Sequence, residues 1–207
     1  MNISTINSII FDLGGVLIDW NPAYVFDRLF DDEEKKRYFF EHICTSDWNE
    51  MQDEGRSLRE ATDSLVAEHP EWKEYIEAYY GRWEEMLGGP IPGTVEILRR
   101  LKEADRHRLY ALTNWSAELF PIALQKYDFL HWFHGRVVSG EEKMRKPYPE
   151  FYQLTLDRFS LDPASTLFID DNQRNIEGAA RIGLVTLRFH SPEQLEQDLR
   201  SRNILDR

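Results

Sequence analysis

Cysteine is nearly absent from this sequence, and long hydrophobic runs are absent altogether. Cys44 is the one cysteine in 207 residues, so no disulfide can form within the chain. This usage is typical of a reducing compartment, and a cytoplasmic location is expected. The N-terminal apolar stretch is short, lacks a basic leader and is interrupted by Asp12, which argues against a signal peptide or a membrane span.

Basic residues are scarce relative to acidic ones. The chain has 25 Lys and Arg against 37 Asp and Glu, a formal net charge of −12. Such a chain would repel a nucleic acid or an anionic membrane surface, so neither is expected as a partner. It would also repel an anionic substrate, unless a divalent cation and a local basic patch reverse the field. A monomer and a homodimer both remain open.

Residues 8–17 are the most informative stretch. The apolar run 9–11 predicts a buried parallel strand that ends at Asp12, just before Gly14 and Gly15. A carboxylate there lies at the carboxyl edge of the sheet, where open α/β folds bind their ligands. The glycines allow close approach of the backbone to a ligand, and their N–H groups are expected to hold an anion.

The rest of the chain predicts an α/β core interrupted by helices. Residues 31–87 are charged and aromatic with no convincing strand, and 88–93 is a Gly- and Pro-rich linker. Helices and strands alternate after it, which indicates right-handed βαβ units and a Rossmann-like parallel sheet with helices on both faces. The expected helices are 21–30, 33–42, 58–68, 71–87, 94–104, 117–127, 149–159, 174–182 and 192–200, and the expected strands are 9–11, 108–113, 137–138, 167–169 and 185–187.

Four separated segments follow one another in a familiar order. They are 12–16, 112–114, 145–147 and 170–172. Together they resemble the haloacid dehalogenase-like superfamily of phosphohydrolases, whose pattern is a nucleophilic Asp, a Thr or Ser, a Lys and an acidic pair. The resemblance covers nearly the whole chain. It implies a core of residues 1–15 and 90–207, with an all-helical cap inserted at 16–89.

The resemblance also implies catalytic roles. Asp12 would attack phosphorus and form an aspartyl phosphate. Thr113 would donate its hydroxyl to a phosphoryl oxygen, with the backbone N–H of Asn114 beside it. Lys146 would neutralise the charge that gathers between the phosphoryl group and Asp12. Arg145 is expected to be an ordinary surface charge.

Mg²⁺ is the expected cofactor, because it takes oxygen ligands and often shares them with a phosphate. Asp12 and Asp171 are the candidate side-chain ligands, with Asp170 as a second ligand or a water-bridged support. The backbone carbonyl at position 14, which binds the metal in the family, is retained by Gly14. Asn172 and Asn175 could orient the acidic loop or cap the helix that follows, and capping is the role expected for Asn175.

Gly14 is a departure from the family pattern, because most phosphatases of the superfamily have an acid–base Asp at that position. The Asp-Leu-Gly pattern is similar to the subgroup that includes bacterial glucose-1-phosphate phosphatases. General acid–base help is worth ~10²–10⁴-fold in rate, so its loss favours leaving groups that need little protonation. A sugar 1-phosphate is one such substrate. Alternatively, a cap carboxylate such as Asp53 or Glu54 supplies the proton.

The cap would select the small phosphorylated substrate. Residues 48–56 mix aromatic, amide and charged side chains, and Gly55 indicates a turn at the end of a helix. The expected pocket residues are Trp20, Trp48, Gln52 and Arg56.

Two alternatives to a phosphatase follow from the same residues. Haloacid dehalogenases also lack the second Asp, and Tyr152 lies at a spacing from Lys146 that they use. They need no cation, however, and two adjacent carboxylates without one would repel each other. A catalytically weak phosphometabolite-binding protein is the other alternative, supported by Gly14 alone.

Overall fold

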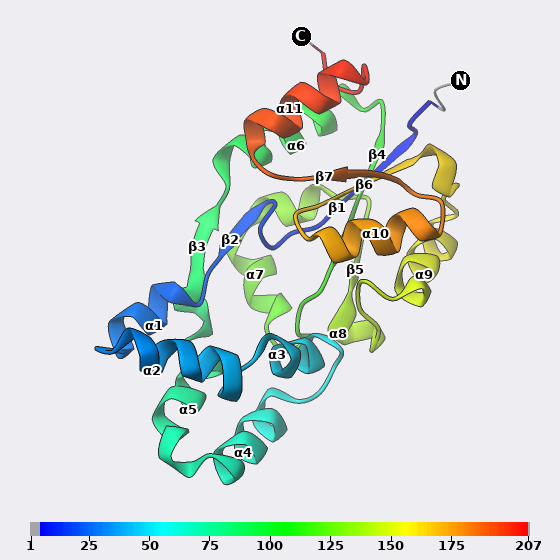
Figure 1. The fold of residues 1–207 in the computed structure, drawn as a ribbon. Helices are drawn as coiled ribbons and strands as arrows, with labels where there is room; N and C mark the ends of the chain where they lie inside the picture. The colour runs from blue at the N-terminus through cyan, green and yellow to red at the C-terminus, as the bar shows by residue number, and fades with distance from the viewer. Residues whose placement is uncertain (1–4, 207) are drawn as a thin grey trace.

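A parallel five-stranded sheet forms the centre of the computed structural model, which describes residues 5–206 (Figure 1). Neighbouring strands all run parallel. Across the sheet the strands are β5 (Gly135–Val138), β4 (Arg108–Thr113), β1 (Ser8–Phe11), β6 (Thr166–Asp170) and β7 (Val185–Arg188).

Helices cover both faces of this sheet. Along β1 the side chains alternate, because successive residues of a strand point to opposite faces: Ile9 and Phe11 join one apolar cluster and Ile10 the other. The cluster with Ile10 contains residues of α9 (Pro149–Phe159) and α10 (Gln173–Arg181). The other contains residues of α6 (Pro92–Ala104), α7 (Phe120–Lys126) and α11 (Pro192–Ser201). The predicted α/β architecture is confirmed.

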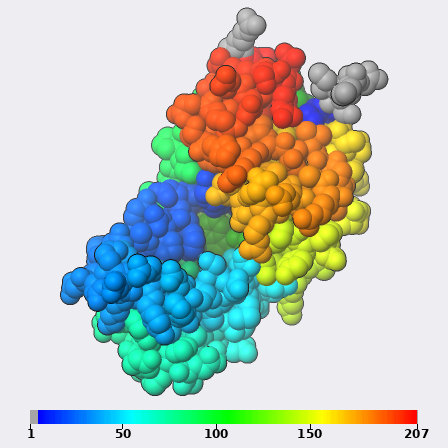
Figure 2. Space-filling view, in the orientation of Figure 1, coloured from blue at the N-terminus to red at the C-terminus, as the bar shows by residue number. Residues whose placement is uncertain are grey.

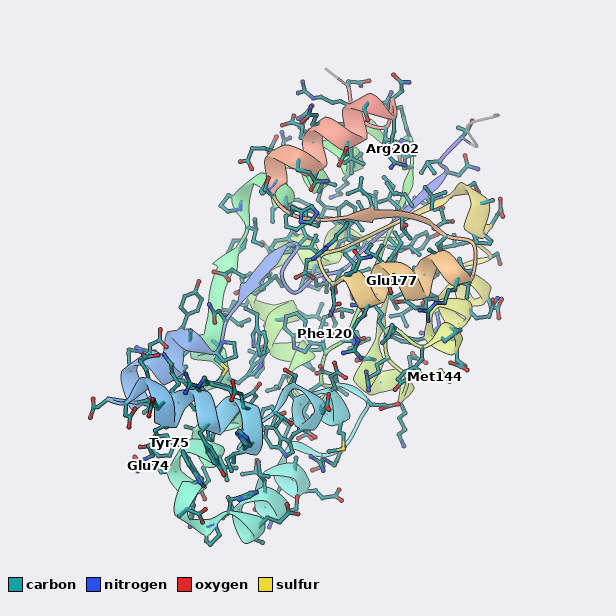
Figure 3. The ribbon with its side chains drawn as sticks, in the orientation of Figure 1. Glu74, Tyr75, Phe120, Met144, Glu177 and Arg202 are labelled. Carbon is teal, nitrogen blue, oxygen red and sulfur yellow. The ribbon has the colours of Figure 1, made fainter. Side chains whose placement is uncertain are left out.

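Residues 21–86, which we call the helical segment, lie between β1 and β4 in sequence. Side chains cap several of its helices: Asp32, Thr45 and Ser57 accept backbone N–H groups of the first turn. Its interior is aromatic, and Phe30 stacks on Tyr75, which is labelled in Figure 3, with 4.2 Å between ring centroids. Its elements are α1 (Ala23–Leu29), α2 (Glu33–Tyr38), a π-helix (Phe39–Ile43), α3 (Ser46–Asp53), α4 (Leu58–Glu68), α5 (Lys73–Gly81) and 3₁₀ turns at Pro70–Trp72 and Trp83–Met86.

Two short strands enclose the helical segment and were not predicted. β2 (Ile18–Trp20) pairs antiparallel with β3 (Leu87–Pro90), so the predicted linker at 88–93 is wrong over its first residues. A Cβ added to Gly88 would lie 2.2 Å from an oxygen of Asp19, so this glycine permits close strand contact. The predicted helix 71–87 is likewise divided, because residues 83–86 tighten into a 3₁₀ turn before β3.

The remaining elements are short. The predicted division into core and cap at residues 16 and 89 stays a prediction. Connecting turns are found at Asp128–Trp132, Ser139–Glu142 (α8) and Pro163–Ser165. Within residues 5–206, no helix has the length and apolar character needed to cross a membrane. Figure 2 shows a face of the molecule that is hollowed between the blue-to-cyan helical segment and the orange region of α10.

Candidate active site

Polar side chains from three strands meet at the carboxyl edge of the sheet. Asp12 directly follows β1, Thr113 is the last residue of β4 and Asp170 is the last residue of β6. Because β1 lies between β4 and β6 in parallel register, the ends of those strands flank Asp12. The buried apolar strands thus carry three predicted site residues to one place.

Three carboxylates form the centre of the site. Asp12, Asp170 and Asp171 each have an oxygen within 4.8 Å of the others. Asp12 and Asp170 are buried, whereas Asp171 is exposed. An oxygen-only donor set of this kind suits a hard divalent cation. The group could therefore hold a metal ion.

Burial and mutual repulsion perturb these carboxylates. Burial raises the pKa of Asp12 well above its ordinary value; Lys146 opposes the rise, and Asp170 and Asp171 add to it. Burial, followed by the charge of Asp170, raises the pKa of Asp171. Like charges held this close favour protonation unless a cation compensates them. The arrangement is therefore electrostatically suited to positive charge.

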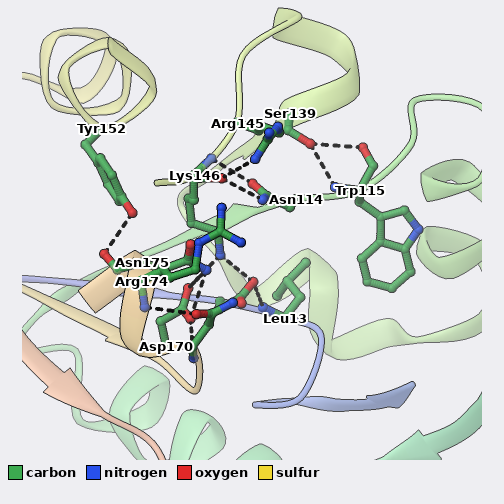
Figure 4. Close-up of polar contacts among 12 residues, drawn as sticks. Leu13, Asn114, Trp115, Ser139, Arg145, Lys146, Tyr152, Asp170, Arg174 and Asn175 are labelled. Atoms are coloured by element: carbon green, nitrogen blue, oxygen red, sulfur yellow. Dashed lines mark hydrogen bonds and ion pairs between the residues drawn. The ribbon is translucent and has the colours of Figure 1, made fainter. Parts of the chain in front are cut away.

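Lys146 supplies one such charge from within the protein. Its side chain is fully buried, with Nζ 2.8 Å from Oδ1 of Asp12 and 2.7 Å from Oδ2 of Asp170 (Figure 4). Burial alone would lower the pKa of Lys146, but the two carboxylates hold it above its ordinary value. The lysine is therefore a cation fixed beside Asp12.

Amide side chains fix the backbone around these charges. Asn114 accepts a hydrogen bond from the Lys146 N–H at 2.9 Å and donates to the Lys146 carbonyl at 3.0 Å. Asn175 donates to both oxygens of Asp170 at 3.1 and 3.0 Å. The predicted capping role of Asn175 is wrong, because Asn172 accepts the N–H of Arg174 and caps α10. Asn175 instead orients the acidic pair.

Gly14 and Gly15 have different structural roles. Gly15 has φ +73° and a Cβ there would meet an oxygen of Asp171 at 2.5 Å, so only glycine allows Asp171 to approach. Its N–H donates to the carbonyl of Ile18 at 2.9 Å, so the predicted anion-binding role of this N–H is not available. Gly14 has no positive φ, and a Cβ there would meet nothing within 4 Å.

Two cavities open onto this edge of the sheet. The larger has a volume of about 410 Å³, and Asp12, Lys146 and Asp171 lie on its wall. The smaller has a volume of about 100 Å³, and its wall includes the aromatic rings of Trp20, Tyr80, Trp83 and Trp115. Both cavities are bordered by Gly14, Trp20, Asn49, Asp53 and Asn114.

The whole arrangement matches one known protein family. The family model described as "Hydrolase: haloacid dehalogenase-like hydrolase" matches residues 6–183. The chain belongs to the haloacid dehalogenase-like (HAD-like) hydrolases.

Similar proteins include two phosphatases and one solved structure. The sesquiterpene phosphatase astK of Aspergillus oryzae is 27% identical over 89% of this chain and 90% of its own length. The phosphorylated carbohydrates phosphatase of Thermotoga maritima is 24% identical over 86% of this chain and 82% of its own length. A HAD family enzyme of Bacteroides thetaiotaomicron, in complex with magnesium and inorganic phosphate, has a TM-score of 0.70. It is 24% identical, covers 90% of this chain and 95% of its own, and shows that the fold is shared.

The helical segment of this HAD-like hydrolase contributes a different set of residues than predicted. Trp20 borders both cavities as expected, but Trp48, Gln52 and Arg56 border neither. Trp48 packs edge-on against Tyr79 with 5.3 Å between ring centroids. The three residues lie on the side of α3 and its C-terminal turn that packs within the helical segment.

The opposite side of α3 lines the larger cavity with Ser46, Asn49, Glu50 and Asp53. These residues are spaced by three and four, so they form one polar stripe of the helix. A polar helical stripe ordinarily faces solvent, which explains why only Asp53 of this stripe, as a possible proton donor, was predicted at the site. Here the core of the HAD-like fold covers it.

Arg145 and Arg174 connect this stripe to the core. Arg145 lies 2.9 Å from Glu50 and 3.3 Å from Glu54, and its side chain is only 12% exposed. Arg174 lies 3.3 Å from Glu50. The prediction of Arg145 as a plain surface charge is therefore wrong: it joins the loop of Lys146 to α3.

Two further predicted residues have distinct environments. The Thr113 hydroxyl is buried and has no hydrogen-bond partner among the residues that the structure describes. It is thus an unused donor at the sheet edge, although Thr113 borders neither cavity. The hydroxyl of Tyr152, in contrast, donates to the carbonyl of Asn175 at 2.8 Å, and Tyr152 borders neither cavity.

Proposed function

We propose that this HAD-like hydrolase is a Mg²⁺-dependent phosphatase that acts on small phosphorylated metabolites through Asp12. One observation carries the proposal: Asp12 faces a cavity with a buried lysine at 2.8 Å and two further carboxylates beside it. A nucleophilic carboxylate, a fixed cation and an oxygen-rich cation site are what phosphoryl transfer requires. The phosphatases among its relatives support the same reaction class.

Asp12 and Asp171 would hold Mg²⁺, together with the carbonyl of Gly14. Asp170 accepts hydrogen bonds or an ion pair from Lys146, Asn172 and Asn175, so it is better suited to position the site than to bind the ion directly. The bound cation would neutralise the phosphate and the carboxylates around it.

The chain's own residues would carry the reaction. Asp12 attacks phosphorus and the ester oxygen leaves, which gives an aspartyl phosphate that water then hydrolyses. The unpartnered hydroxyl of Thr113 and the backbone N–H of Asn114 would bind phosphoryl oxygens. Lys146 would balance charge as it moves from Asp12 to the phosphoryl group.

Sugar phosphates are the substrates that the cavities favour, with sugar 1-phosphates first. Amides of Asn49 and Asn114 border the space and suit hydroxyl groups, while the ring of Trp20 offers an apolar face. The indole N–H groups of Trp20 and Trp115 are buried without a partner among the described residues. They are further donors for a polar ligand.

Haloacid dehalogenation is less well supported. Burial and then the charge of Asp170 raise the pKa of Asp171, and a cation-free reaction leaves the repulsion between the two carboxylates uncompensated. Tyr152, the residue that favoured this reading, has its hydroxyl occupied by a backbone carbonyl. A binding protein without catalysis would not need Asp12 and Lys146 in direct contact.

Hydrolysis of p-nitrophenyl phosphate tests the proposal. We expect turnover with Mg²⁺, loss of turnover in EDTA and recovery when Mg²⁺ is restored. Full activity in chelator together with chloride release from 2-chloropropionate would identify a dehalogenase. Binding of phosphate without turnover of any phosphate ester would identify a non-catalytic protein.

A further inference from the structure

The departing oxygen of a phosphate ester needs a proton, and within residues 5–206 the titratable groups on the core side of the larger cavity, Asp12, Lys146 and Asp171, have other tasks. Asp12, Asp170 and Asp171 are gathered around Lys146 and the cation site. Gly14, which borders both cavities, has no side chain, and a Cβ there would meet nothing within 4 Å. The space beside the nucleophile is therefore open toward the helical segment.

Two carboxyl groups face this space from α3, and their surroundings differ. Glu50 forms ion pairs with Arg145 at 2.9 Å and with Arg174 at 3.3 Å. Asp53 has no Lys, Arg or His nitrogen within 4.0 Å among residues 5–206. Its nearest side-chain partner is the amide of Asn49, 3.5 Å away. Of these two carboxyl groups, Asp53 is thus the one without an ion-pair partner among the described residues.

Asp53 also has the proton affinity that the task requires. Burial, with a contribution from Glu50, raises the pKa of Asp53 to about 7, although Arg145 and Lys146 oppose the shift. The other titratable groups that face it are the phenols of Tyr79 and Tyr80 on α5. An acid whose pKa lies near neutrality is the most effective proton donor and acceptor there.

We propose that Asp53, on α3, is the general acid and base of this enzyme. As Asp12 attacks phosphorus, the P–O ester bond breaks, its electron pair stays on the departing oxygen, and that oxygen takes the proton of Asp53. The Asp53 carboxylate then takes a proton from the water that attacks the aspartyl phosphate, which releases phosphate and restores both residues. This assignment rests on the proposed phosphatase reaction.

This assignment extends the range of esters that the enzyme could hydrolyse. An acid on the helical segment would let the enzyme cleave esters of alcohols that leave poorly without protonation, such as primary alkyl phosphates. Preference for a sugar 1-phosphate would then arise from binding rather than from leaving-group acidity. The acid would also work only while α3 lies against the core, where the ion pairs of Arg145 hold it.

The test compares two substrates in the Mg²⁺-loaded enzyme. We expect Asp53→Asn to lower kcat/KM for glucose 6-phosphate by ~10²–10⁴-fold and that for p-nitrophenyl phosphate by only a few-fold. Asp47→Asn on the exposed side of the same helix is the matched control and should leave both rates unchanged. Equal losses on the two substrates, or no loss on either, would overturn the assignment.

The unmodified enzyme gives a second measurement, independent of how the variant folds. Because the acid must be protonated, kcat/KM for glucose 6-phosphate should fall as the pH rises through about 7, the pKa of Asp53 in the free enzyme. The rate with p-nitrophenyl phosphate should lack this decline. Identical pH profiles would exclude Asp53 as the acid, whereas an enzyme inactive on both esters would instead refute the phosphatase reaction itself.

Discussion

The cavity has two walls, the sheet edge and helix α3, and they are built in different ways. Arg145 and Lys146 are neighbours in sequence, but each belongs to a different wall. Lys146 belongs to the sheet edge, where it is fully buried between Asp12 and Asp170. Arg145 belongs to the contact with α3, where it pairs with Glu50 and Glu54 at partly exposed positions. One wall has buried charges with several fixed partners, and the other has ion pairs near solvent.

This difference indicates that the two walls have different functions. Buried charges in fixed positions need no reorganisation during a reaction, which suits the sheet edge to the chemical step. The pair of Arg145 with Glu54, whose side chain is 43% exposed, is weak and screened by salt, so the contact between α3 and the core should loosen more easily than the sheet edge. Changes at the sheet edge should therefore affect kcat most, and changes at the helical wall other than at Asp53, the proposed acid, should affect KM.

The largest effect is expected at Asp12. Asp12→Asn replaces the nucleophilic carboxylate with an amide of the same size, so turnover of p-nitrophenyl phosphate should fall below about 1%. The melting temperature should stay close to that of the parent enzyme. Asp31→Asn, at an exposed position of the helical segment, is the control. Activity above a few per cent would remove Asp12 from its role.

The next largest effect is expected at Gly15, and its neighbour Gly14 should tolerate the same substitution far better. An alanine at position 15 would place its methyl group against Asp171, and its backbone would have to keep a positive φ that costs an L-residue ~1–2 kcal/mol. Gly15→Ala should therefore lower kcat about tenfold or more. Mg²⁺ should also bind this variant less tightly. Gly14→Ala has open space and no positive φ, so its loss should be much smaller. Equal losses would mean that the contact of Asp171 with the Gly15 backbone is unimportant.

The sheet edge could be predicted from sequence because strand and site coincide there. Apolar runs fix which segments become parallel strands, and the residues that end them must meet at one edge. Asp12 and Asp170 follow from this rule, whereas the role of Thr113 is what the resemblance to the family implies. Lys146 lies on a loop, so only the resemblance to a family indicated its position.

The helical wall could not be predicted in the same detail. In a helix that is polar on one side and mixed on the other, the sequence does not distinguish a polar stripe that faces solvent from one that faces a cavity. The predicted pocket residues of α3 were therefore taken from the wrong side of the helix. β2 and β3 have three and four residues, too few for a periodic pattern. Asn175 was misassigned because Asn172, three residues earlier, is an equally good cap.

Two residues of α3 and its C-terminal turn should separate its two sides. Asn49→Ala removes an amide from the cavity wall, so KM for a sugar phosphate should rise about two- to tenfold, the worth of one hydrogen bond. Arg56→Ala, on the side of Gln52, should leave KM unchanged while it lowers the melting temperature. A larger rise in KM for Arg56→Ala than for Asn49→Ala would show that the substrate binds on the side of the helix that the sequence first indicated.

The smallest effect is expected where α3 meets the core outside the cavity. Glu54 pairs with Arg145 at 3.3 Å, is 43% exposed and borders neither cavity, so Glu54→Gln weakens the contact without altering the wall. A pair of this kind contributes ~0.2–1 kcal/mol, so KM for p-nitrophenyl phosphate, which needs no acid, should rise by at most about fivefold with kcat unchanged. Because salt screens exposed charges, the difference from the parent should vanish near ~1 M salt, where the Debye length is about 3 Å. Glu77→Gln, which breaks a surface pair with Lys73 within α5, is the control and should not change KM at any salt concentration. A loss in kcat that salt does not reduce would show that the contact of α3 with the core belongs to the chemical step, and that the two walls are not separate in function.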